Sequence, residues 1–155
     1  MKIVKKILVA LLIIFVIMQF FGPDKNQGDI ATIDAFIAET NPPTEVHEIL
    51  KNNCFDCHSN FTKYPWYNNI TPVNYWMADH VDHGKGDFNV SEWTSYSVKK
   101  KDHKIEELIE EVEERHMPLP SYTWTHGELS DEDIQAIVTW GKQVRAQYRS
   151  QIQSE

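Results

Sequence analysis

Cys54-Phe55-Asp56-Cys57-His58 is the stretch that decides how the rest of this 155-residue chain is interpreted. It contains both cysteines of the chain, and a histidine follows the second one directly. Two thiols three positions apart can reach the two vinyl groups on one edge of a porphyrin, and the next residue can then send an imidazole nitrogen to the iron. The spacing therefore predicts a covalently attached c-type haem, with thioether bonds at Cys54 and Cys57 and with His58 as the proximal iron ligand.

The same motif has three other interpretations, which the residues leave open. A redox dithiol with this spacing normally accompanies a βαβ pattern, and strand-like runs are missing here. A zinc site usually needs four protein ligands, so it would have to recruit two further histidines. A disulfide across two intervening residues would close a very small loop and stabilise the fold little. Haem attachment is the favoured interpretation.

The composition is that of an ordinary globular protein, with 41% hydrophobic and 25% charged residues. The length leaves room for one domain once a targeting segment is subtracted. The formal net charge of −8 argues against nucleic acid as a partner and against broad adhesion to anionic lipid. An acidic balance would suit docking to a basic protein surface, although a solvated acidic face is the simpler explanation.

Residues 1–22 differ in kind from the rest and are expected to be a signal-anchor or a signal peptide. Three lysines precede an apolar run, Ile7–Phe21, that only Gln19 interrupts. This order is typical of an export segment, but no A-x-A-like cleavage site follows. Residues 3–21 approach the roughly 20 residues that a bilayer requires, and the lysines would stay in the cytoplasm. We expect a single membrane anchor with the domain on the periplasmic side of a bacterial cytoplasmic membrane; a cleaved, periplasmic form is the alternative.

After this segment, the chain divides into a linker, one domain and a short tail. Turn residues and a weak helical pattern predict a linker with a short helix over residues 23–43. Residues 44–150 form the expected c-type haem-binding domain, and residues 151–155 form the tail. The segments 61–70 and 87–97 are expected to be loops. Apolar periodicity and start signals predict four helices, beginning near Thr44, Thr71, Lys99 and Ser130.

Aromatic residues gather after the central motif, where they would suit the surroundings of a porphyrin. Tyr64 and Trp66 lie in a segment that can wall one face of the haem and exclude water. Trp76 and His80 share the apolar stripe of the following helix. A histidine on such a stripe is more often a satisfied core residue, so His80 is only a candidate haem-propionate partner or alternative iron ligand.

A second iron ligand is expected from Met117. Six-coordinate haem electron carriers place a thioether sulfur opposite the histidine, which raises the reduction potential. Met117 lies on a loop that Pro118 rigidifies, far enough along the chain to return across the haem. His116, which extends the apolar stripe of the preceding helix, is the next candidate. His80 and an open coordination site remain as further alternatives.

An ordered set of short motifs accompanies the central one: Tyr64-Pro65-Trp66-Tyr67, Pro72, His80-Val81-x-x-Gly84, Phe88-Asn89-Val90-Ser91-Glu92-Trp93, Met117-Pro118, Tyr122 and His126. With residues 53–60, this set resembles the haem-binding-domain family of exported mono-haem, cytochrome c-like proteins, over about residues 44–140. The resemblance implies an all-α, cytochrome c-like domain wrapped around one covalently attached haem, here preceded by an N-terminal hydrophobic helix. Met117 matches the family's M-P loop, which supports its role as distal ligand. Val90 departs from the smaller or polar residue expected there.

These features favour electron transfer over catalysis. A membrane-tethered or exported mono-haem cytochrome would carry single electrons between unidentified redox proteins outside the cytoplasmic membrane. The alternative is a haem domain with a labile distal site, which would act in peroxide chemistry or gas sensing. A metal-binding stalk without porphyrin is a third possibility. No acid–base or nucleophile constellation stands out away from the haem region, so no catalytic residue is assigned.

Overall fold

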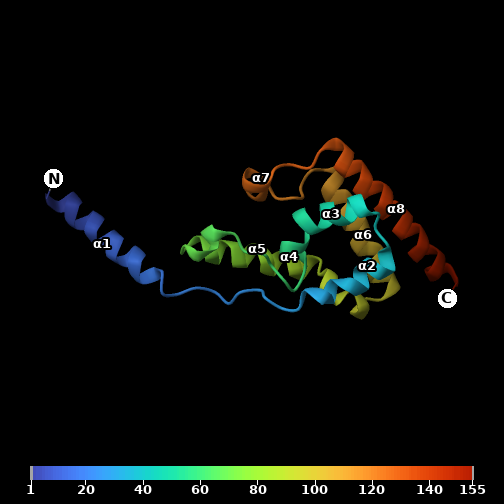
Figure 1. Ribbon diagram of the computed structural model, residues 1–155, viewed down its shortest axis with the longest axis horizontal. Coiled ribbons are helices and arrows are strands. Elements are labelled where there is room, and N and C mark those ends of the chain that lie inside the picture. The colour runs from blue at the N-terminus through green and yellow to red at the C-terminus, as the bar shows by residue number, and fades with distance from the viewer. Residues whose placement is uncertain (1, 155) are drawn as a thin grey trace.

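The computed structural model describes residues 2–154, and its regular structure is helical (Figure 1). Within this range the one extended pairing is an isolated antiparallel bridge between Gln27 and Phe61. The expected all-α class is therefore confirmed. The α-helices (α) and 3-10 helices (η) are α1 (Lys2–Met18), η1 (Ile30–Ile33), α2 (Asp34–Thr40), α3 (Thr44–Asn53), α4 (Phe55–His58), η2 (Trp66–Asn69), α5 (Val73–Asp87), η3 (Val90–Ser95), α6 (Val98–Glu113), α7 (Pro120–His126) and α8 (Asp131–Ser154).

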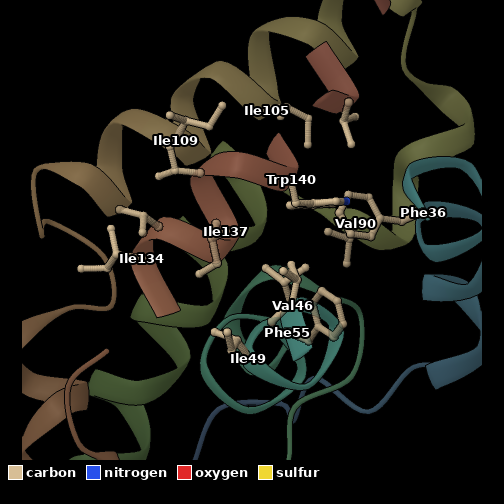
Figure 2. Close-up of a cluster of buried hydrophobic side chains, with 14 of the residues drawn as sticks. Phe36, Val46, Ile49, Phe55, Val90, Ile105, Ile109, Ile134, Ile137 and Trp140 are labelled. Atoms are coloured by element: carbon tan, nitrogen blue, oxygen red, sulfur yellow. The ribbon is translucent and has the colours of Figure 1, made fainter. Parts of the chain in front are cut away.

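Helices α6 and α8, which share the most extensive contact between any two elements, form one side of the domain (Figure 1). Buried apolar residues at helical spacing line both helices, including Ile105 and Ile109 on α6 and Ile137 on α8 (Figure 2). Gly141 permits the close crossing, because a Cβ atom there would lie 2.9 Å from Cγ1 of Ile109. Helix α8 continues to Ser154 and so takes in most of the expected tail.

Aromatic rings join this helix pair to the N-terminal half of the domain. Phe36 on α2 is fully buried and packs edge-on against Phe55, Trp93 and Trp140 at centroid distances of 5.0–6.2 Å. The indole Nε1 of Trp140 donates a hydrogen bond of 3.0 Å to the carbonyl of Thr40. The short helix expected in the linker is thus part of the main core, which begins upstream of residue 44 (Figure 2).

Two predicted helix starts have different outcomes. Ser130 caps α8 as expected: the amide of Asp133 donates to the Ser130 hydroxyl oxygen, and the Asp133 carboxylate accepts from the Ser130 amide. Thr71 does not cap α5, where Pro72 occupies the N-cap position. The Thr71 hydroxyl instead donates to the carbonyl of Phe21, so a contact distant in sequence replaces the local cap.

The chain between α1 and η1 is held against the domain. We call residues 23–29 the strap. The side-chain amide of Asn26 donates to the carbonyl of Ser59 and to the hydroxyl of Thr62, both at 2.9 Å. Its oxygen accepts from the Lys85 ammonium, also at 2.9 Å, and its backbone amide donates to the hydroxyl of Tyr64. The strap therefore packs on the segment that follows the cysteine motif.

Helix α1 projects away from the domain, and its side chains are exposed (Figure 1). Backbone hydrogen bonds continue the helical turn beyond Met18, ending with the Phe21 amide that donates to the Met18 carbonyl. Between residues 2 and 154 no helix has both the length and the apolar character needed to cross a membrane.

Candidate functional site

The ring of His58 is fixed by two backbone carbonyls. Its Nδ1 lies 2.9 Å from the carbonyl oxygen of Gly84 and 2.9 Å from that of Phe88. Carbonyl oxygens only accept, so Nδ1 carries the hydrogen and Nε2 keeps a free lone pair. Burial lowers the pKa of His58 more than the two carbonyls raise it, which favours the neutral ring. The protein thus presents Nε2 as a ready metal ligand.

Helix α5 reaches His58 because it crosses α4 at a glycine. A Cβ atom on Gly84 would lie 2.9 Å from the backbone oxygen of Cys57 and 3.3 Å from its Cβ. Only a residue without a side chain allows this approach. Gly84, the glycine of the H-V-x-x-G motif, therefore has a structural role: it brings its own carbonyl within hydrogen-bonding distance of His58.

Met117 lies in the same cleft as His58. The cleft has a volume of about 320 Å³, and Cys57, His80 and Tyr122 also line it. The structure thus brings the predicted proximal and distal ligands to one cavity from segments far apart in sequence.

His116, the next candidate ligand, does not line this cleft. Its side chain is 63% exposed and lies 3.3 Å from the carboxylate of Glu114 and 3.7 Å from that of Glu111. These partners hold the imidazole on the outer surface.

The predicted aromatic surroundings are only partly assembled around this cleft. Trp76 and His80 line an adjoining cavity that also contains Cys57, and their rings lie 4.4 Å apart. His80 donates from Nδ1 to the Trp76 carbonyl at 2.7 Å, so its Nε2 is also free of a proton when the ring is neutral. Tyr64 lines neither the cleft nor the adjoining cavity and instead lies beside the strap. Trp66 is 76% exposed.

The two cysteines are free and protonated at neutral pH. Burial, followed by the neighbouring Cys57, raises the pKa of the Cys54 thiol to about 12. Burial and the charge of Asp56 raise the pKa of Cys57 to about 11. A reactive dithiol needs a lowered pKa, so these values disfavour that interpretation. In the described part of the chain no three His, Cys, Asp or Glu side chains are grouped to hold a metal ion.

Helix α7 contributes a residue to which sequence reasoning gave no role. Tyr122 lines the cleft, the adjoining cavity of Trp76 and His80, and a third cavity of about 950 Å³ that Phe55 and Tyr64 also line. Its hydroxyl donates to the carbonyl of Asn52 at 2.8 Å, and its ring stacks on His126 at a centroid distance of 3.9 Å. Pro120 at the helix start and the i, i+4 spacing of the stacked pair were the available signals for this helix.

The residues present fit a haem. His58, held in one tautomer, lines one mainly apolar cleft together with Met117 and Cys57. Cys54 does not line this cleft and packs against the hydrophobic core. A histidine and a methionine are one of the ligand pairs that hold haem iron in proteins.

Comparison with known proteins supports haem binding. Residues 13–143 match the model of a family described as a haem-binding domain. Neither the curated proteins nor the solved structures yielded a match. The family match spans well over half of the chain, from α1 into α8, and includes every residue of the candidate site named above. The chain belongs to the haem-binding domain family.

Proposed function

We propose that this protein is a mono-haem c-type cytochrome that carries single electrons between protein partners outside the cytoplasmic membrane. The observation that carries the proposal is the shared cleft of His58 and Met117, with Nε2 of His58 free to bind iron. A histidine and a thioether as the two axial ligands characterise electron carriers rather than oxygen-activating haem proteins.

Each residue has a defined task in this proposal. Cys54 and Cys57 would hold the haem through thioether bonds, and the haem would supply a one-electron iron couple. The carbonyls of Gly84 and Phe88 orient His58 and increase its basicity through Nδ1–H. Because these acceptors belong to the backbone, the ligand cannot swing away without displacing α5. A rigid ligand set limits rearrangement when the iron changes charge.

Export and anchoring belong to the same proposal. Helix α1 by itself is too short to span a membrane, but its turn continues to Phe21, and residues 3–21 approach the roughly 20 residues that a bilayer requires. This segment would hold the protein in the cytoplasmic membrane, with three lysines on the cytoplasmic side and the haem domain in the periplasm. The net charge of −8 would favour partners with basic docking surfaces.

The test is an oxidised and a reduced absorption spectrum of the full chain, expressed by export in a host that matures c-type cytochromes. We expect a low-spin spectrum of covalently attached haem, with the weak methionine-to-iron band in the oxidised form. Met117→Ala should keep the haem, since the thioethers are untouched, and should convert the iron to a high-spin, ligand-accessible form. Met77→Leu is the matched control, because Met77 lines the adjoining cavity and not the cleft.

Three results would change the proposal. A chain without covalent haem would remove the roles of Cys54, Cys57 and His58. An unchanged spectrum in Met117→Ala would transfer the distal role to another residue, with His80 the first to test. A high-spin spectrum of the unaltered chain would replace electron transfer by peroxide chemistry or gas sensing.

A further inference from the structure

The cavity that Trp76 and His80 line continues the cleft of His58 and Met117. The two spaces share four lining residues: Cys57, His80, Leu119 and Tyr122. A porphyrin extends from its iron in every direction of its plane, so a haem bound in the cleft needs room beyond the two axial ligands. The adjoining cavity, with walls from η2, α5 and α7, offers this room.

Two hydroxyl groups from different elements meet at the rim of the adjoining cavity. The hydroxyl of Tyr67 on η2 lies 3.3 Å from that of Thr125 on α7, and the Thr125 hydroxyl also lies 3.3 Å from the carbonyl of Tyr122. Hydrogen bonds between an O–H group and an oxygen prefer about 2.7–2.8 Å, so both contacts are long and weak. Both hydroxyls are therefore available to a stronger acceptor.

The adjoining cavity carries less negative charge than the cleft. The carboxylates of Asp79 and Asp87 line the cleft and not the cavity. The cavity has the ammonium of Lys63 and the carboxylate of Asp56, which already accepts from the Lys63 backbone amide at 2.9 Å. Since like charges repel, an anionic group meets less repulsion in the cavity than in the cleft.

We infer that Tyr67 and Thr125 bind a propionate carboxylate of the haem and that Lys63 supplies the opposite charge. The inference rests on the haem of the proposed function and adds the residues that hold its propionate side. Each hydroxyl exchanges a long contact with a neutral oxygen for a charge-assisted hydrogen bond. An ionised carboxylate is costly to bury, so a rim that is open to solvent at Thr125 suits it.

The same bonds have a consequence for α7. Tyr67 and Thr125 belong to η2 and α7, and α7 has no buried residue of its own. A carboxylate that accepts from both hydroxyls therefore joins α7 to the domain through the cofactor.

His80, a candidate propionate partner from its sequence, has no donor left for this task when its ring is neutral. Its Nδ1 hydrogen is directed at the carbonyl of Trp76 at 2.7 Å, and its Nε2 carries a lone pair. A lone pair repels a carboxylate, so the hydroxyls of Tyr67 and Thr125 are the better partners.

The experiment is resonance Raman spectroscopy of the full chain, matured with haem in the same export host, together with a redox titration. The propionate bending band moves to lower frequency when a propionate loses a hydrogen bond. We expect this shift in Tyr67→Phe and in Thr125→Val. We also expect a lower reduction potential in both, because an unbonded carboxylate stabilises the ferric iron more. Tyr75→Phe is the matched control: Tyr75 is 47% exposed on α5 and lines neither the cleft nor the adjoining cavity.

The outcomes separate this inference from the proposed function. A bending band that is unchanged in either variant, or that shifts equally in Tyr75→Phe, would overturn the propionate assignment. If the haem is low-spin with histidine and methionine ligands, that result leaves electron transfer standing. A high-spin haem whose band still depends on Tyr67 and Thr125 would remove electron transfer and keep the propionate site. A chain that takes up no haem would overturn both.

Discussion

The two faces of helix α4 differ in how they are held. On one face, Phe55 is buried among other rings, with Phe36 perpendicular to it at a centroid distance of 6.2 Å (Figure 2). On the other face, His58 meets two backbone carbonyls and a cleft. Apolar packing fixes the first face, and hydrogen bonds from one crossing helix fix the second.

This difference teaches where stability and function lie in the molecule. The face that carries Phe55, here called the core face, belongs to a core of large side chains from α2, α3, η3, α6 and α8. The face that carries His58, here called the cleft face, is next to α7, which has no buried residue. Helix α7 contacts α3 through the hydroxyl of Tyr122. The domain therefore has a stable framework on one side and a site completed by its cofactor on the other.

The largest expected effect comes from removing a ring from the core face. Trp140 is 3% exposed, and its Nε1 donates to the Thr40 carbonyl. Trp140→Ala should lower the free energy of unfolding by about 3–5 kcal/mol, since it leaves a cavity and an unpaired carbonyl. Urea denaturation followed by circular dichroism measures the loss.

Trp124 provides the matched control on the cleft side. It is 83% exposed on α7, so Trp124→Ala should change the free energy of unfolding by less than about 0.5 kcal/mol. If Trp140→Ala and Trp124→Ala lowered the free energy of unfolding by similar amounts, the core face would not be more stable than the cleft face.

A smaller loss of stability is expected from a substitution where α4 and α5 cross. An alanine at Gly84 would press against the Cys57 carbonyl, which cannot move without shifting the backbone. Overpacking of this kind costs about 1–3 kcal/mol. We expect Gly84→Ala to destabilise the domain by an amount in this range and to lower the fraction of chains that carry haem, because His58 loses its fixed orientation.

Gly86 is the control on the same helix. A Cβ atom there meets nothing within 4 Å, so Gly86→Ala should stabilise α5 by up to about 1 kcal/mol and leave haem content unchanged. Equal haem content in the two glycine variants would show that the close crossing does not position the histidine.

The core face was largely predictable from the sequence. The apolar stripes of α6 and α8 have the helical period, and Ser130 with Asp133 gives a local start signal. Such signals lie within a few residues of the element that they specify. They predict the individual helices, the family resemblance implies the all-α class, and the cysteine motif points to the cofactor without any knowledge of the fold.

The cleft face was less predictable because its contacts join distant residues. His58 is bonded to a carbonyl 26 residues away, and backbone carbonyls leave no mark in a side-chain pattern. Thr71 has the local sequence of a helix cap, yet it bonds to a partner 50 residues upstream. Trp66 lies in the predicted aromatic wall but is 76% exposed, and the buried position of its 3-10 helix η2 is taken by Asn68.

The smallest effect would come from the single hydroxyl that holds α7 to α3. Tyr122→Phe removes the hydrogen bond to the Asn52 carbonyl and keeps the ring that stacks on His126. A partly exposed hydrogen bond is worth about 1 kcal/mol, which corresponds to roughly fivefold faster opening of α7. Amide hydrogen exchange should show this acceleration over residues 120–126 and no change in α6 or α8. Equal acceleration in α8 would mean that α7 opens only with the whole domain, and the cofactor side would then be part of the framework.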